Sequence, residues 1–270
     1  MPNLKSNLLL ETLEKIWQPS DRIAMLHYGR CGSTVLGDLL GQHPDIFWDS
    51  EVFERLYTQQ LWESRWLKEP LSLLRLRVGL AWLTRRQCYG FETKCHPAYH
   101  LRKAILNTVP AQYISDLRQL GYRHFIGLKR QNYLRQYVSE KVGQQKGKVW
   151  HQPAGTQAQL EPITLDTDCV RFGYYQMPLL DSFAERDRGY AELEAILAGD
   201  RALWLTYEDD ILNNPKQGYQ RVCDFIGLPV HPVTIKRSRT NPFPLQKILR
   251  NFSEVEACLQ GTPYEWMLYD

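Results

Sequence analysis

The sequence predicts an α/β fold in which a parallel β-sheet is covered by helices on both faces. Segments with the pattern of buried strands alternate with segments of helical period along most of the chain, which is typical of a parallel sheet. Three predicted strands run into polar clusters, at 30–34, 94–96 and 129–130. The carboxyl ends of parallel strands meet at one edge, so we expect these clusters to lie together. With 270 residues, 43% of them hydrophobic, we interpret 1–270 as a single domain.

The first third of the chain contains the first predicted strand. Residues 4–17 predict an amphipathic helix, the main part of an N-terminal helical arm over 1–20. A strand, a turn and a helix follow within 23–40, and then a short strand at 46–48. The Leu-, Trp- and Arg-rich segment 61–86 predicts a helical insertion, which either packs on the sheet or covers an acceptor site.

The remaining chain continues the alternation. The predicted strands are 89–96, 122–128 and 202–207, and the predicted helices are 111–120, 133–142, 174–198 and 216–226. The polar segment 143–164 predicts a loop over the site, and the basic run Lys236–Arg239 predicts a surface loop.

Composition excludes several classes of function. A net charge of +3 without long blocks of one sign argues against nucleic acid, and no apolar run is long enough to span a bilayer. The N-terminus lacks a signal-peptide pattern, and the six cysteines are scattered as in reduced cytosolic proteins, so we expect a cytoplasmic location. We expect no metal site, since Cys88, Cys95, His96 and His100 fit no zinc-ribbon spacing. The oligomeric state is not indicated.

The turn after the first strand has the features of an anion site. Unpaired amides at the start of a helix favour an anion, and Gly32 allows the backbone to approach it closely. Ser33 and Thr34 add hydroxyl donors, and Arg30 adds a planar charge. The residue between Gly32 and Thr34 is Ser33, so the lysine of the nucleotide-triphosphate P-loop motif is missing.

A second basic cluster follows a later strand. Arg130 ends that strand, and Ser139 lies nine residues on, within a predicted helix that returns it toward the same edge. A cation and a hydroxyl near a helix start suit a second phosphate. Two phosphate sites predict a nucleotide that is phosphorylated at both ends.

These two motifs together resemble those of the sulfotransferases that use 3′-phosphoadenylyl sulfate (PAPS), most closely the bacterial Stf-zero type that includes trehalose sulfotransferase. The resemblance covers roughly residues 22–228 and implies a P-loop-like sulfotransferase fold, PAPS as the donor cosubstrate and no metal. It implies that the 5′ side of PAPS is bound by Arg30, Cys31, Gly32, Ser33 and Thr34, and the 3′-phosphate by Arg130 and Ser139. Cys31 stands where the family usually has a small hydroxyl residue.

Sulfuryl transfer also needs a base for the acceptor. Glu51 resembles the catalytic glutamate of the Stf-zero type, and His96, in Lys94-Cys-His96, resembles the histidine base of the cytosolic sulfotransferases. We favour Glu51, with Arg30 and Lys94 assisting the leaving group. The structural alternatives are a solvated carboxylate for Glu51 and a histidine bonded to backbone for His96.

The sequence therefore predicts transfer of a sulfuryl group to a hydroxyl, in preference to an amine, of a small-molecule, glycan or lipid acceptor. Two rival functions stay open. A P-loop-type kinase could hold Mg²⁺ at Glu208 and Asp209, although one of these carboxylates is also a possible ion-pair partner for Arg130. The other rival is a non-catalytic nucleotide-binding module on the same fold.

Overall fold

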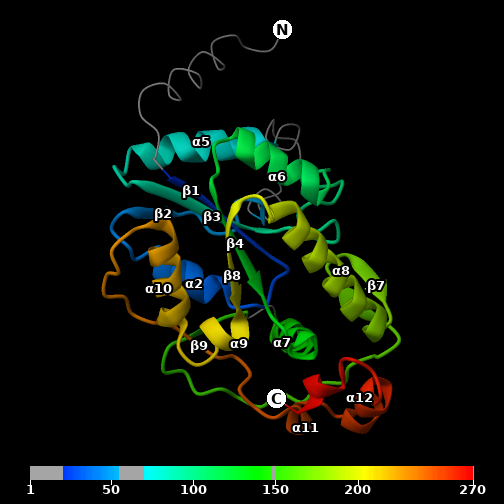
Figure 1. The fold of residues 1–270 in the computed structure, drawn as a ribbon. Helices are drawn as coiled ribbons and strands as arrows, with labels where there is room; N and C mark the ends of the chain where they lie inside the picture. The colour runs from blue at the N-terminus through cyan, green and yellow to red at the C-terminus, as the bar shows by residue number, and fades with distance from the viewer. Residues whose placement is uncertain (1–20, 55–69, 148–149, 270) are drawn as a thin grey trace.

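A five-stranded parallel sheet forms the centre of the protein (Figure 1). The computed structural model describes residues 21–54, 70–147 and 150–269. Across the sheet the strands follow the order β2 (Ile46–Trp48), β3 (Cys88–Lys94), β1 (Asp21–His27), β4 (His124–Lys129) and β8 (Arg201–Thr206). The register pairs His27 with Lys94 on one side and with Leu128 on the other, so the three central strands end at the same level.

Alternating side chains of β1 divide the core between the two faces of the sheet. Ile23 and Met25 pack with α2 (Ser33–Leu40) and α10 (Pro215–Ile226). Ala24 and Leu26 pack on the opposite face. The layer on that face consists of α5 (Pro70–Trp82), α6 (Pro110–Gln119) and α8 (Leu179–Leu197). Figure 1 shows α2 and α10 on one side of the strands and α6 and α8 on the other. The predicted parallel sheet with helices on both faces is confirmed.

A third cluster of buried side chains lies beyond the carboxyl ends of the strands. It joins α7 (Tyr133–Gln145) and the start of α8 to the C-terminal segments, which are α11 (Leu245–Ile248), α12 (Phe252–Leu259) and the 3-10 helix η2 (Glu265–Leu268). Asn132 connects them, because its side chain caps α7 and donates a hydrogen bond to the Met267 carbonyl at 2.9 Å. This packing fixes α7 at the edge of the sheet where the polar clusters converge.

Several predicted segments are corrected by the structure. The predicted helix 174–198 begins only at Leu179, and it is preceded by a hairpin of β6 (Val170–Phe172) and β7 (Tyr175–Met177). The predicted surface loop at Lys236–Arg239 contains β9 (Arg237–Ser238), which pairs with β5 (Gln152–Pro153). A four-residue helix, α9 (Tyr207–Asp210), follows β8. The predicted arm over 1–20 and the part of the 61–86 insertion before Pro70 lie outside the described residues. No helix in the described ranges has the length and hydrophobicity needed to cross a bilayer.

Candidate functional site

A cavity of about 800 Å³ opens at the carboxyl edge of the sheet. Its walls come from the β1–α2 loop, the end of β3, α7, the segment that begins at Trp150, the β6–β7 hairpin and the segment after β9. It brings together most residues that the sequence singled out: Arg30, Gly32, Ser33, Thr34, Glu51, Lys94, Arg130 and Ser139. Cys31 and His96 are not among the lining residues.

The β1–α2 loop turns sharply so that the start of α2 faces the cavity. Gly29, Arg30 and Gly32 all have positive φ, at 84°, 52° and 85°. A Cβ at Gly32 would lie 2.7 Å from Ile211 Cγ2, so this position requires glycine on both counts. The first bond of the helix runs from the Leu36 amide to the Gly32 carbonyl, which leaves the preceding amides without partners inside α2. These amides and the helix dipole make the loop suited to an anion.

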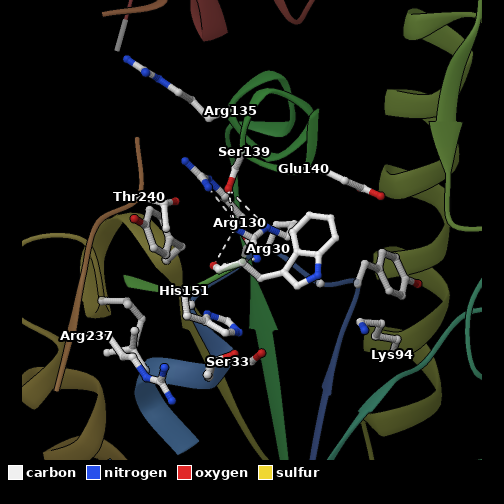
Figure 2. Close-up of a pocket in the computed structure, with 18 of the residues that line it drawn as sticks. Arg30, Ser33, Lys94, Arg130, Arg135, Ser139, Glu140, His151, Arg237 and Thr240 are labelled. Carbon is white, nitrogen blue, oxygen red and sulfur yellow. Dashed lines mark hydrogen bonds between the residues drawn. The ribbon is translucent and has the colours of Figure 1, made fainter. Parts of the chain in front are cut away.

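Three side chains form what we call the arginine end of the cavity: Arg30, Arg130 and Ser139. Arg30 donates to Ser139 Oγ from Nε at 3.2 Å and from Nη2 at 2.8 Å, and Arg130 donates to the Arg30 carbonyl at 3.2 Å (Figure 2). Burial, together with the nearby Arg130 charge, lowers the pKa of Arg30, although Glu140 opposes this. Two guanidiniums and a hydroxyl converge here, which is the donor set that binds phosphate.

The main chain and the side chain of Arg30 contribute to different parts of the cavity. Its main chain belongs to the β1–α2 loop, which the resemblance assigns to the 5′ side of PAPS, and its guanidinium donates to Ser139, which the resemblance assigns to the 3′-phosphate. Arg30 has a positive φ, and its side chain reaches Ser139 on α7. The structure therefore groups Arg30 with Arg130 and Ser139.

Glu208 lies next to the arginine end but does not line the cavity. Its carboxylate accepts the amides of Gln131 at 3.0 Å and Asn132 at 3.1 Å, while the Nε of Arg130 lies 4.0 Å from Glu208 Oε1. The ion pair with Arg130 that the sequence left open is therefore present, but it is long. The main contacts of Glu208 hold the start of α7 in place.

The side chain of Cys31 points away from the cavity. It is fully buried in the cluster that also contains Ile23, Met25 and Leu36. A thiol behaves there as a small hydrophobic group. Only the main chain of Cys31 is left to contribute to the anion site at the loop.

The opposite part of the cavity contains a cluster that we call the lysine end: Lys94, Glu51, Glu54 and His100. Lys94 Nζ lies 2.6 Å from Glu51 Oε2 and 4.0 Å from Glu54 Oε2. Burial of Glu51 works to raise its pKa, but the charge and hydrogen bond of Lys94, together with His100 and His27, outweigh burial and hold the pKa well below the usual glutamate range. Burial likewise works to lower the pKa of Lys94, and the two carboxylates raise it. Both members of the pair are therefore charged at neutral pH.

His96 is held in the core beside the lysine end. Its Nδ1 accepts the Ala98 amide at 3.1 Å, and its Nε2 lies 3.3 Å from Glu185 Oε1. The ring packs between Tyr28 and Phe172 and is 4% exposed. Burial, with the Arg186 charge, lowers the pKa of His96 to about 4, although Glu185 opposes this. Both ring nitrogens have local partners, as the structural alternative for His96 expects.

The cavity is also lined by residues that were not among the candidate site residues from the sequence. Glu140 follows Ser139 on α7, and Figure 2 shows it on the Lys94 side of the arginine end, with His151, Thr240 and Arg237 on the opposite side. Arg237 is held by Asp38 Oδ2 at 2.7 Å, and the Arg30 guanidinium lies 5.3 Å from the centroid of the Trp150 ring. The basic run 236–239 was the sequence feature that could have identified Arg237 as a lining residue. No sequence feature pointed to Glu140.

One set of possible metal-ligating groups lines the cavity. Carboxylate oxygens of Glu51 and Glu54 and a ring nitrogen of His100 lie within 4.8 Å of one another. The ammonium group of Lys94 already lies among these oxygens. His100 Nδ1 accepts the Lys94 amide at 3.2 Å, so only its Nε2 faces the carboxylates. The set therefore fits an internal ion pair better than a metal.

Known proteins match this chain only at the level of structure. No protein-family profile and no curated protein match the sequence. A structure titled as the sulfotransferase domain from the curacin biosynthetic pathway is 13% identical, with a TM-score of 0.43 over 86% of this chain and 83% of its own. A sulfotransferase from Alicyclobacillus acidocaldarius is 14% identical, with a TM-score of 0.45 over 94% of this chain and 95% of its own.

Proposed function

We propose that the protein is a sulfotransferase that takes the sulfuryl group from PAPS. The observation that carries the proposal is that one cavity contains two separate anion-binding arrangements, the start of α2 and the arginine end. A nucleotide with phosphates at both its 3′ and 5′ positions matches such a pair. The sequence motifs Arg30–Thr34 and Leu128–Ser139, which resemble those of PAPS enzymes, support the same donor.

Each side chain has a role in this proposal. The amides at the start of α2, with Ser33 and Thr34, bind the 5′-phosphate that carries the sulfuryl group. Arg130, Ser139 and Arg30 bind the 3′-phosphate. Lys94 lies against the loop, since a Cβ at Gly29 would be 3.4 Å from Lys94 Cε, and it neutralises charge on the leaving phosphate.

Transfer requires one bond to form and one to break at sulfur. The acceptor oxygen bonds to sulfur, the bond from sulfur to the 5′-phosphate oxygen breaks, and a base takes the acceptor proton. We assign that proton to Glu51, because its carboxylate lines the cavity beside Lys94 while His96 lies outside the lining. The product nucleotide is 3′-phosphoadenosine 5′-phosphate (PAP).

The kinase alternative has less support. All three carboxylates after β8 are engaged: Glu208 by two amides, Asp209 by Thr206 Oγ1 at 2.7 Å, and Asp210 by the Thr206 amide at 2.8 Å and by Arg221. None of these three carboxylates is among the residues that line the cavity. The loop also lacks the lysine of the triphosphate-binding motif.

A thermal-unfolding experiment separates the candidates. PAP with EDTA should raise the melting temperature, by about 5–10 °C at 100 times its Kd, because binding stabilises only the folded state. Stabilisation by ATP with Mg²⁺ alone would favour the kinase. PAP binding without a sulfated metabolite in cells that express the protein would favour the non-catalytic module. The Glu51→Gln variant should bind PAP and form no sulfated product.

A further inference from the structure

Lys94 lies between two places that attract a cation. Its ammonium is paired with Glu51 at 2.6 Å, and its side chain packs against Gly29 in the loop that we assign to the 5′-phosphate. The register of β1 and β3, which pairs His27 with Lys94, fixes the base of the side chain at this point. A lysine side chain is a flexible four-carbon stem, so rotations within it move the charge by several ångströms without moving the strand.

The charges of the lysine end do not favour an anion as they stand. Lys94 brings one positive charge, and Glu51 and Glu54 bring two negative charges. His100 adds none, because its Nδ1 accepts the Lys94 amide and burial lowers its pKa, although Glu54 opposes this. An anion at the start of α2 therefore meets a neighbouring cluster with an excess of negative charge. It gains the Lys94 charge only by competing with Glu51.

We propose that Lys94 changes partner during donor binding, leaving Glu51 for the anion at the β1–α2 loop, and that this exchange frees Glu51 to accept the acceptor proton. The proposal rests on the proposed function. It makes Lys94 a positioning residue for the base as well as a cation for the donor. A carboxylate held by an ammonium is a weak base, so Glu51 becomes an effective base only after the donor is bound.

Other titratable groups surround the Lys94–Glu51 pair and affect the pKa values of its two members. Those that act on Glu51 or Lys94 are Glu54, His100, His27, Glu92 and Glu140. Once Lys94 leaves, the burial of Glu51 acts without its main opponent, and the pKa of Glu51 rises toward the range of a useful base. The donor therefore binds first, and Glu51 becomes able to accept the acceptor proton second.

A double-mutant cycle on PAP affinity tests the exchange. We expect Lys94→Met to weaken PAP binding about tenfold and Glu51→Gln to tighten it about tenfold, because the anion no longer competes for Lys94. In the Lys94→Met background, Glu51→Gln should change the affinity less than about threefold. Isothermal titration calorimetry measures all four affinities, and Glu54→Gln, whose carboxylate lies 4.0 Å from Nζ, should have a smaller effect than Glu51→Gln.

Two results overturn the exchange. Equal tightening by Glu51→Gln in both backgrounds would mean simple repulsion between carboxylate and anion, with no role for Lys94. Unchanged or weaker binding in Glu51→Gln would mean that the pair does not compete with the anion. Thermal unfolding without PAP checks that each variant is folded, and Lys94→Gln replaces Lys94→Met if that variant is not. Failure of the unsubstituted protein to bind PAP would instead overturn the proposed function.

Discussion

The two ends of the cavity hold their cations in opposite ways. At the arginine end, Arg30 contacts a hydroxyl and a main-chain carbonyl, and none of the carboxylates that the structure describes forms an ion pair with it. At the lysine end, Lys94 is paired with Glu51 at 2.6 Å and approached by Glu54. The first end presents positive charge to a ligand, whereas the second neutralises its own charge.

This difference suggests that the arginine end contributes mainly to donor affinity and the lysine end mainly to the transfer reaction. Arg30 has a hydroxyl and a main-chain carbonyl as its partners, and the contact of Arg130 with Glu208 is long, at 4.0 Å, so the arginine end should supply most of the binding energy for an anion. An ion pair must be broken before its cation can help, so the lysine end contributes less to affinity. It offers instead a carboxylate whose basicity depends on what binds beside it. The predictions below test this division.

The largest effect on stability and PAP binding is expected from a substitution at Gly32, which disturbs the anion site of the β1–α2 loop. Gly32→Ala places a Cβ at positive φ and 2.7 Å from Ile211 Cγ2, so we expect a loss of about 2–5 kcal/mol in stability from backbone strain and overpacking. PAP binding should be lost as well. Gly227→Ala is the matched control, because Gly227 has a similar φ of 77° with no atom within 4 Å of its Cβ position. Denaturant unfolding and calorimetry measure both quantities, and equal effects in the two variants would contradict the role of Gly32.

The next effect tests the arginine end directly. Arg130→Ala should weaken PAP binding by about 1.5–3 kcal/mol, the usual contribution of a hydrogen bond to a charged group. The loss should exceed that of Lys94→Met in the same titration, because Lys94 must first leave Glu51. An unchanged PAP affinity would remove Arg130 from the site, and a larger loss in Lys94→Met would reverse the assignment of affinity to the two ends.

A pH effect on stability separates His96 from the lysine end. The folded protein holds the pKa of His96 near 4 through burial, against about 6.5 when unfolded, so the unfolded chain binds the extra proton between these values. Stability is then lost as pH falls through 6.5 toward 4, by about 2 kcal/mol at pH 5. His96→Gln should flatten this part of the curve of unfolding free energy against pH, and His231→Gln serves as the control. A curve that keeps its slope in His96→Gln would show that His96 is not buried as a neutral residue.

The sequence was sufficient for the sheet but not for the small ribbons around the cavity. Apolar runs between helical periods identify all five strands of the sheet, including the three-residue β2. The β6–β7 hairpin has three residues per strand, and its Gly173 is required by a distant contact, since a Cβ there would lie 2.0 Å from the Ala98 carbonyl oxygen. The β5–β9 pair joins residues more than 80 positions apart. Local patterns do not encode such contacts.

The site residues, like the strands, could be predicted only as far as local sequence patterns determine them. Residue types and spacing singled out Arg130, Ser139, Lys94 and Glu51, and all four line one cavity in the structure. They did not determine where each side chain points. Arg30 turns toward Ser139, 109 positions away, and Cys31 turns into the core. Both orientations involve contacts with residues that are distant in the sequence, such as Ser139 and Trp150 for Arg30 and Ile126 and Ile211 for Cys31.

A crystal structure of the complex with PAP tests the central claim most directly, because that claim assigns each phosphate to a different part of one cavity. We predict the 5′-phosphate at the amides of Ser33 and Thr34, the 3′-phosphate at Arg130 and Ser139, and the Lys94 ammonium turned from Glu51 toward the 5′-phosphate. A nucleotide bound in the reverse orientation, or outside this cavity, would contradict the assignment of a PAPS donor site.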